Sequence, residues 1–227
     1  MMKAICCLAI AAVALCAGNA PGGKQRSDLP PRKVIIGTTM QQFWVEYPGL
    51  DKRLDELSAL VDRMAQASQK RYGRGLDIAV LPETAVSGEG LAHAVPLEGP
   101  LKDVFSKKAR QLRTYIVVPT YLADDGAKAR YTNAAILFGR TGEVVGIYRK
   151  VHLAVHTASD SMEDGTTPGK EVQVFDCDFG KLGIQICFDI EFDYGWEELA
   201  RKGADLVVWP TQSPQTASPA FRAKRYG

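Results

Sequence analysis

Hydrophobic and polar positions along this chain follow two different periods. Apolar residues recur every three or four positions in two stretches, which predicts two long amphipathic helices. The first contains Leu50, Leu54, Leu57, Val61 and Met64, and the second contains Leu101, Val104, Phe105, Ala109 and Leu112. Short apolar runs lie between and beyond them and predict strands. These are "KVIIGTTM" (33–40), "DIAVLPE" (77–83), "TYIVVPTYL" (114–122), "YTNAAILFG" (131–139) and "EVVGIYRK" (143–150).

The last third of the pattern continues this alternation. The segment 172–187, "VQVFDCDFGKLGIQIC", predicts a hairpin that turns near Gly180, just as glycine at 126 and Thr141-Gly142 predict turns between earlier strands. A third helix is expected around Trp196, Leu199 and Ala200, followed by a strand in "ADLVVWPTQSP" (204–214). Strands that alternate with helices and also pair in hairpins predict an α/β chain with a mixed sheet covered by helices.

The N-terminus has a different composition. One lysine precedes an apolar run over residues 4–17, which is short for a membrane span and typical of a signal peptide. We therefore predict a leader over 1–20, a Pro- and Gly-rich linker over 21–32 and a domain over 33–227, exported to a secreted or periplasmic location. An uncleaved anchor is the alternative. The remaining composition, 46% hydrophobic with a net charge of +2, is that of a globular protein and gives no reason to expect nucleic acid.

Cysteine positions single out one thiol. Three of the five cysteines, Cys6, Cys7 and Cys16, fall in the predicted leader. Of the other two, Cys177 is expected near the hairpin turn, whereas Cys187 follows the second strand. At about 3.3 Å per residue the two would be too far apart for a disulfide. Cys187 is therefore predicted to be a free thiol.

Three polar residues follow apolar strands: Glu83, Lys150 and Cys187. Sites in sheets covered by helices form beyond the carboxyl ends of strands, so the three are predicted to meet. Taken singly, they are an ordinary solvated acid, a surface lysine and a core thiol. Together they supply what thiol chemistry needs, because a carboxylate can accept the thiol proton and an ammonium can stabilise an oxyanion.

The motifs "LPET", "GEVVGIYRKVHL" and "GIQICFDIEFDYGWEELARKGADLVVWP" resemble, in this order, the three signatures of the nitrilase superfamily, the carbon–nitrogen hydrolases. The resemblance implies an αββα sandwich with mixed β-sheets and a Glu83–Lys150–Cys187 triad that works without metal or cofactor. It also implies that the backbone N–H of Phe188 helps to bind the oxyanion. A supporting second glutamate would be Glu163, for which a solvated loop position is the alternative.

The chain departs from the family pattern in two ways. Glu191 and Asp193 stand where many relatives have Arg and Pro, and Glu89 stands where an aromatic is common. Glu89 and Glu191 are therefore candidate substrate-binding residues that favour a neutral or cationic substrate. After "AFRAKRYG" the family pattern continues further, so the resemblance implies that the C-terminal part of the sandwich is missing from this sequence.

The predicted function is hydrolysis of an amide, carbamoyl or nitrile carbon, with an amidase or carbamoylase favoured by family frequency. The predicted partner is that small molecule, with no membrane after leader cleavage, and a homo-oligomer is left open. Two rival hypotheses remain: a Cys–His hydrolase using His152 or His156, and a non-catalytic binding or partner subunit of the same fold. A zinc site at these two histidines is the weakest, because no further ligand pair accompanies them.

Overall fold

The computed structural model describes residues 7–14, 33–40, 46–124, 130–156, 161–213 and 217–226. Its largest sheet has the order β1-β2-β3-β4-β5-β6. These strands are Cys7–Ala14, Lys33–Met40, Ile78–Val80, Tyr115–Asp124, Arg130–Phe138 and Val144–Arg149. The sheet is mixed, because β3 runs parallel to β2 and β4, whereas the pairs β1–β2, β4–β5 and β5–β6 are antiparallel.

A second sheet has the order β11-β10-β9, with strands Leu206–Val208, Gly180–Ile184 and Val174–Cys177. It is also mixed, since β10 is antiparallel to β9 and parallel to β11. A third pair joins β7 (Val155–His156) to β8 (Ser161–Met162).

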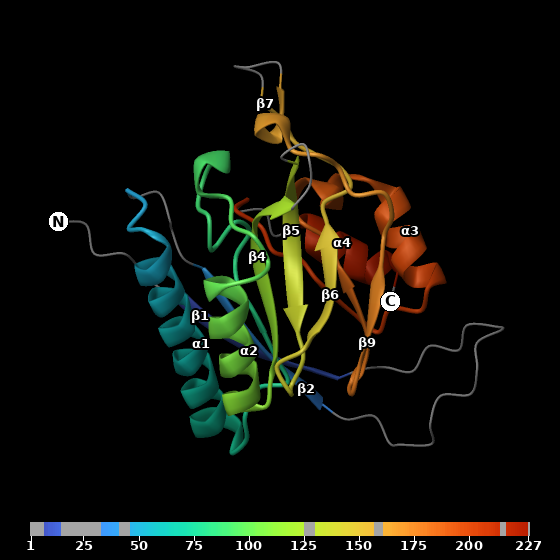
Figure 1. The fold of residues 1–227 in the computed structure, drawn as a ribbon. Coiled ribbons are helices and arrows are strands. Elements are labelled where there is room, and N and C mark those ends of the chain that lie inside the picture. The colour runs from blue at the N-terminus through green and yellow to red at the C-terminus, as the bar shows by residue number, and fades with distance from the viewer. Residues whose placement is uncertain are drawn as a thin grey trace.

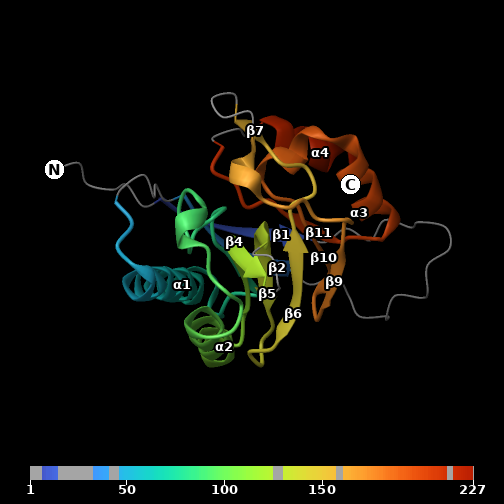
Figure 2. The same cartoon turned by 45° about the horizontal axis from the view of Figure 1, so that its top comes forward.

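Helices cover both outer faces. In Figure 1, α1 (Leu50–Tyr72) and α2 (Pro100–Leu112) lie side by side over the large sheet, and α3 (Asp193–Arg201) and α4 (Ala217–Tyr226) lie beyond the small one. Three short 3-10 turns complete the elements: η1 (Leu91–His93), η2 (Glu163–Gly165) and η3 (Cys187–Glu191). Figure 2 shows the layers in the order helix, sheet, sheet, helix, which confirms the predicted αββα sandwich. Among the described residues, no helix is both long and apolar enough to cross a membrane.

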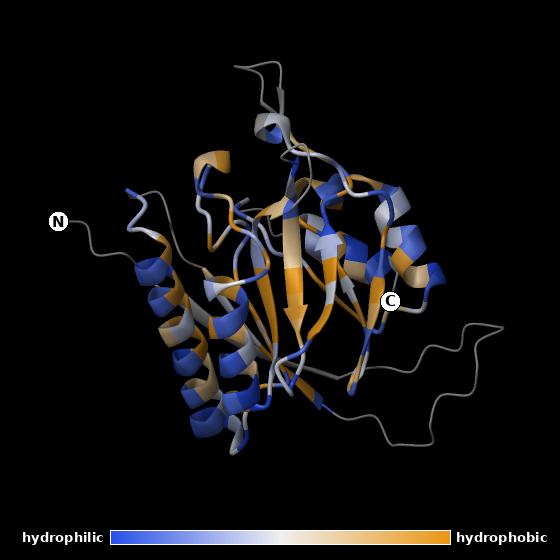
Figure 3. Ribbon diagram, viewed as in Figure 1, coloured by the Kyte–Doolittle hydropathy of each residue, from blue (hydrophilic) through white to orange (hydrophobic). Residues whose placement is uncertain are grey.

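Two hydrophobic cores follow from the alternation of side chains along the strands. On β5, Ala134, Ile136 and Phe138 face the core under α1 and α2, whereas Ala135 and Leu137 face the core between the sheets. Figure 3 shows the matching pattern on the helices, whose apolar positions point towards the sheet while their polar positions point outward. The apolar residues with helical spacing in the sequence thus form the faces of α1 and α2 that pack against the sheet.

Two strands end earlier than predicted. The apolar pattern predicts strands that extend to Glu83 and Cys187, yet β3 ends at Val80 and β10 at Ile184. Pro82 cannot donate to a strand ladder, and Cys187 has a positive φ of 43° that is incompatible with extended structure. Only Lys150 directly follows its strand, β6. The predicted linker and the turn at residue 126 lie outside the described residues, and the chain turns at Thr141-Gly142 as predicted.

Candidate active site

Glu83, Lys150 and Cys187 come together where β3, β6 and β10 end. The ammonium of Lys150, 1% exposed, lies 3.0 Å from Oε1 of Glu83, which is 4% exposed. The Cys187 side chain forms hydrogen bonds with Glu83 and Thr211. A buried acid, a buried cation and a partly buried thiol are therefore in contact, although they are far apart in the sequence.

Glu163 joins this group from the η2 turn. Its Oε1 lies 2.5 Å from Nζ of Lys150, and the residue is only 4% exposed. The alternative of a solvated loop charge is therefore wrong for this residue. Two buried carboxylates share one ammonium, so the cluster of these three groups has a formal charge of −1.

Two further partners were not identified from the sequence. Nδ2 of Asn133 donates to Oε1 of Glu83 and to Oε1 of Glu163, each at 2.9 Å. The backbone N–H of Gln212, 129 positions further along the chain, donates to Oε2 of Glu83 at 3.2 Å. Every oxygen of Glu83 thus has a donor, which fixes the orientation of its carboxylate.

Burial and charge act in opposite directions on the ionisable groups. Burial opposes the charged form of Lys150, but the carboxylates of Glu83 and Glu163 outweigh it and raise the Lys150 pKa. For Glu163, burial raises the pKa and the Lys150 charge offsets this only in part. Lys150 is therefore firmly an ammonium, able to hold negative charge that develops beside it.

The Cys187 thiol is held in its protonated form. Its pKa is raised to about 11, chiefly by burial and then by the negative charge of Glu83, while the positive charge of Lys150 acts in the opposite direction. At neutral pH the sulfur therefore keeps its proton, and the adjacent Glu83 carboxylate is the group placed to accept it.

The backbone around Cys187 is strained and firmly held. Its φ of 43° is uncommon for a residue with a side chain. The Cys187 N–H donates to the carbonyl of Pro210 at 2.9 Å, and its carbonyl accepts from Nε1 of Trp209 at 2.8 Å. Thr84 and Glu163 also have positive φ, so strained backbone recurs around this cluster.

Asp189 organises the turn that carries the thiol. Its fully buried carboxylate accepts from the N–H of Ile186 at 3.0 Å, the N–H of His152 at 2.8 Å and the hydroxyl of Tyr148 at 2.7 Å. The helix α4 supports the same turn, because Arg222 donates to the carbonyl of Ile190 at 3.1 Å. The tyrosine and the aspartate are a second missed pair, since nothing in the sequence links β6 to η3.

The same contacts bear on the histidine hypotheses. Nδ1 of His152 lies 3.1 Å from Oδ1 of Asp189, and its ring stacks on Phe192 with centroids 3.9 Å apart. His152 is therefore engaged by the aspartate rather than by the Cys187 sulfur. The side chain of the other candidate, residue 156, lies outside those described. In the part of the chain that the structure describes, no group of three or more His, Cys, Asp or Glu side chains is arranged to hold a metal ion.

The remaining predicted site residues lie at the surface. Phe188, whose backbone N–H directly follows the nucleophile candidate, is 36% exposed and packs edge-to-face on Phe192 at 5.5 Å. Glu89 is exposed in the loop after β3, and Glu191 is exposed at the end of η3. Neither glutamate takes part in the hydrogen bonds of the Glu83–Lys150 cluster that are described above.

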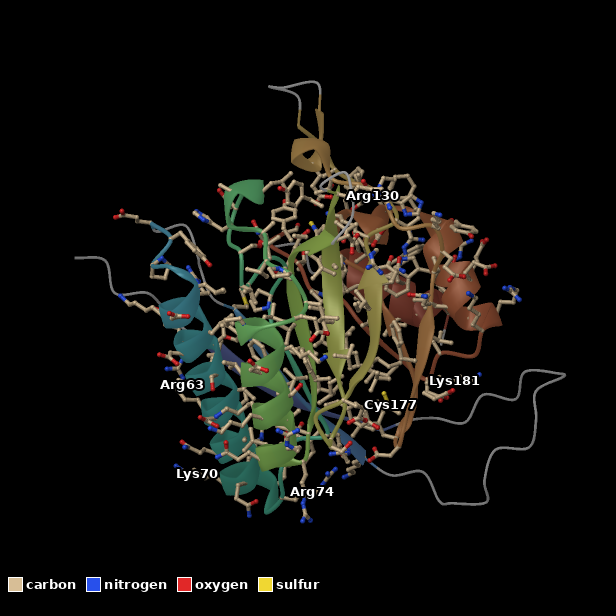
Figure 4. The ribbon with its side chains drawn as sticks, viewed as in Figure 1. Arg63, Lys70, Arg74, Arg130, Cys177 and Lys181 are labelled. Atoms are coloured by element: carbon tan, nitrogen blue, oxygen red, sulfur yellow. The ribbon has the colours of Figure 1, made fainter. Side chains whose placement is uncertain are left out.

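Cys177 and Cys187 are both free thiols, as predicted. Figure 4 shows why: Cys177 lies at the lower end of β9, near Lys181. The site lies at the opposite end of the sheets. Lys150 directly follows Arg149, which pairs with Ala134 near the start of β5. Figure 4 labels Arg130 at this end of β5.

Comparison with known proteins identifies the relatives of this chain. A family model described as carbon-nitrogen hydrolase matches residues 41–221. An omega-amidase NIT2 of Danio rerio is 30% identical over 156 residues, which are 65% of this chain and 56% of that protein. A deaminated glutathione amidase of Yersinia enterocolitica is 26% identical over 66% of this chain and 57% of its own length. A nitrilase of Pyrococcus abyssi is 33% identical over 60% and 52%.

Solved structures share the fold. The crystal structure of Saccharomyces cerevisiae Nit3, described as a member of branch 10 of the nitrilase superfamily, aligns with a TM-score of 0.61 at 22% identity. The alignment covers 77% of this chain and 63% of that one. The chain thus spans less than two thirds of the length of each of these relatives.

Proposed function

The chain belongs to the carbon–nitrogen hydrolase family, and on that basis we propose that it hydrolyses a non-peptide C–N bond with Glu83, Lys150 and Cys187. The observation that carries the proposal is the buried ion pair of Lys150 with Glu83, beside a thiol that is hydrogen-bonded to the same carboxylate. These three groups supply a nucleophile, a base and a positive charge within contact of one another.

In the first step, the Cys187 sulfur attacks the substrate carbon while its proton moves to the Glu83 carboxylate. The carbonyl π electrons move to oxygen, which becomes the oxyanion of a tetrahedral intermediate. Lys150 and the backbone N–H of Phe188 stabilise this oxyanion, because both present fixed positive charge to it. The raised pKa of Cys187 suits this step, since the thiol gives up its proton only to a base that is already in contact.

In the second step, Glu83 returns the proton to the substrate nitrogen, the C–N bond breaks, and ammonia or an amine leaves. The acyl group remains on Cys187 as a thioester. Water then attacks the thioester with Glu83 again as base, and the carboxylic acid departs as the sulfur regains a proton. The site returns to its starting protonation state, so the cycle needs no other reactant.

An amide is the favoured substrate. Relatives include proteins named omega-amidase and deaminated glutathione amidase, besides a nitrilase. We propose the amidase or carbamoylase reaction for this chain because both begin at a carbonyl carbon, where Lys150 can stabilise the oxyanion directly.

One observation favours the alternative of a non-catalytic binding subunit. The Cys187 pKa is raised rather than lowered, whereas many reactive cysteines have a lowered pKa. A buried thiol without a function in catalysis would share this property. The two hypotheses differ in turnover, so an activity measurement separates them.

The test is ammonia release from a panel of amides and N-carbamoyl compounds by the wild-type protein and two single-cysteine variants. Cys187→Ala should abolish release while the protein stays folded. Cys177→Ser is the matched control, because that thiol lies at the other end of the sheets, and its activity should equal that of the wild type. Turnover by a folded Cys187→Ala protein would rule out the proposed nucleophile, and no turnover by the wild type would favour the binding subunit.

A further inference from the structure

Asn133 lies opposite Lys150 on the neighbouring strand. The Lys150 N–H donates to the Asn133 carbonyl at 2.8 Å, one residue beyond the paired Ala134 and Arg149. Both side chains are 1% exposed. Alternation along β5 places Asn133 on the same face as Ala135 and Leu137, which is the face towards the second sheet. The pairing of β5 with β6 therefore places the Asn133 amide and the Lys150 ammonium next to each other, on the side of the sheet that faces the second sheet.

The two donors contact the same two oxygens. Lys150 reaches Oε1 of Glu83 at 3.0 Å and Oε1 of Glu163 at 2.5 Å, and Nδ2 of Asn133 reaches both at 2.9 Å. Two donors and two acceptors thus form a closed ring. Oδ1 of Asn133 is buried and has no hydrogen-bond partner among the described residues, so the amide nitrogen alone connects this side chain to the cluster.

We propose that Asn133 is a positioning residue of the site, which holds Oε1 of Glu83 against Lys150 and leaves Oε2 of Glu83 to accept the Cys187 proton. The inference rests on the proposed hydrolase function and adds a residue to it. Apart from the Cys187 thiol, whose partner oxygen on Glu83 this proposal assigns, the Oε2 atom accepts only the backbone N–H of Gln212 among the contacts described, at 3.2 Å. One of its lone pairs is therefore available for the thiol proton.

The chemistry of the ring explains why an amide suits this position. The ionisable groups that face it are Glu83, Glu163, Lys150 and Cys187. A second cation here would neutralise the base, and a third acid would repel both glutamates. A neutral donor supplies the second hydrogen bond to each carboxylate without changing the charge of the cluster.

Two substitutions and one control test the proposal. Asn133→Asp is nearly isosteric but replaces the donor by an acid, and Asn133→Ser shortens the side chain and adds no charge. The control is Thr132→Val, on the adjacent position of β5 and therefore on the opposite face. Thr132 is also buried, and its hydroxyl has no hydrogen-bond partner among the described residues, so valine removes nothing that the site uses.

Steady-state ammonia release should show kcat reduced about ten- to hundredfold in both Asn133 variants, with little change in KM, because hydrogen bonds to charged groups are lost. In Asn133→Asp the acidic limb of the pH profile should also move to higher pH, because an added carboxyl raises the pKa of its neighbours. Thr132→Val should match the wild type. A folded Asn133 variant with wild-type kcat and pH profile, or an equal loss in Thr132→Val, would overturn the proposal.

A second measurement does not depend on turnover. Alkylation of Cys187 by iodoacetamide, located by peptide mass spectrometry, should be slower in Asn133→Asp than in Thr132→Val, since the added negative charge disfavours the thiolate. Equal rates would overturn the placement of Asn133. If the wild type releases no ammonia while this difference is present, the hydrolase function fails and the placement of Asn133 stands. Should Asn133→Asp not fold, the kcat of Asn133→Ser decides.

Discussion

At the scale of single residues, the Cys187 proton is the central feature. Burial raises the pKa of this thiol, Glu83 raises it as well, and Lys150 lowers it. The proposed base, Glu83, therefore also makes the Cys187 proton harder to remove before substrate binds. This combination protects the sulfur in the free protein, because the thiolate is the form that is alkylated or oxidised.

Because Glu83 and Lys150 act on the Cys187 pKa in opposite directions, removing each of them should change the reactivity of the thiol in opposite directions. At pH 9, Glu83→Gln should speed alkylation of Cys187 by iodoacetamide and Lys150→Met should slow it, because each unit of pKa changes the thiolate fraction roughly tenfold. Glu83→Gln should at the same time lose ammonia release by several orders of magnitude, since the base is gone. Cys177, whose pKa is raised to about 12 by burial and Asp178, is an internal control in the same digest. Equal rates in all three proteins would show that neither group acts on the sulfur.

The sequence predicted three members of the cluster because each follows an apolar strand. It did not distinguish a buried Glu163 from a solvated one, because "SMEDGTTPG" has the composition of any surface loop. Asn133 lies inside the strand "YTNAAILFG", where an isolated polar residue has no local signature. Its role depends on the pairing of β5 with β6, which is a property of the sheet and not of the segment.

At the scale of elements, the two sheets are in close contact where β6 faces β9. A Cβ atom added at Gly146 would lie 2.3 Å from Cε1 of Phe175, closer than any real contact of this kind. Gly146 thus lets the ring of Phe175 pack into the core between the sheets. The hydrophobic pattern predicted both strands, but this contact joins strands of different sheets and has no periodic signal.

Gly146→Ala should therefore lower the free energy of unfolding by about 1–3 kcal/mol, the usual cost of overpacking. Gly75→Ala is the matched control, because nothing lies within 4 Å of a Cβ atom at that position. It should be neutral or slightly stabilising. Urea denaturation of the wild type and both variants measures the difference. A Gly146→Ala protein as stable as the control would mean that the sheets are further apart at this point.

At the scale of the whole molecule, the predicted leader overlaps with the first strand of the large sheet. Cys7–Ala14 is the strand β1, paired antiparallel with β2, and it lies inside the predicted leader. A chain cleaved near residue 20 would lack β1 and leave β2 at the edge of the sheet. We propose export and cleavage, so mass spectrometry of the exported protein should find its N-terminus between residues 17 and 21. A full-length N-terminus in the exported fraction would support an uncleaved anchor.

The arrangement of charge over the molecule bears on the substrate. The net charge is only +2, so long-range attraction of anions is weak. The two exposed glutamates come from opposite halves of the chain: Glu89 follows the strand that leads to Glu83, and Glu191 ends the turn that begins at Cys187. Glu89 and Glu191 add negative charge on the loops next to the proposed site. We therefore propose that they disfavour a carboxylated substrate and favour a neutral or amine-bearing one.

The kcat/KM for neutral or amine-bearing amides should therefore exceed that for carboxylated N-carbamoyl amino acids at low ionic strength. The effect of solvent-exposed charges is modest and screened by salt, so the ratio should shrink by a fewfold at about 1 M salt. Glu191→Gln and Glu89→Gln should each shrink it as well, whereas Glu197→Gln, an exposed position on α3, should leave it unchanged. A preference for the carboxylated compounds that Glu191→Gln does not alter would mean that these glutamates do not face the substrate.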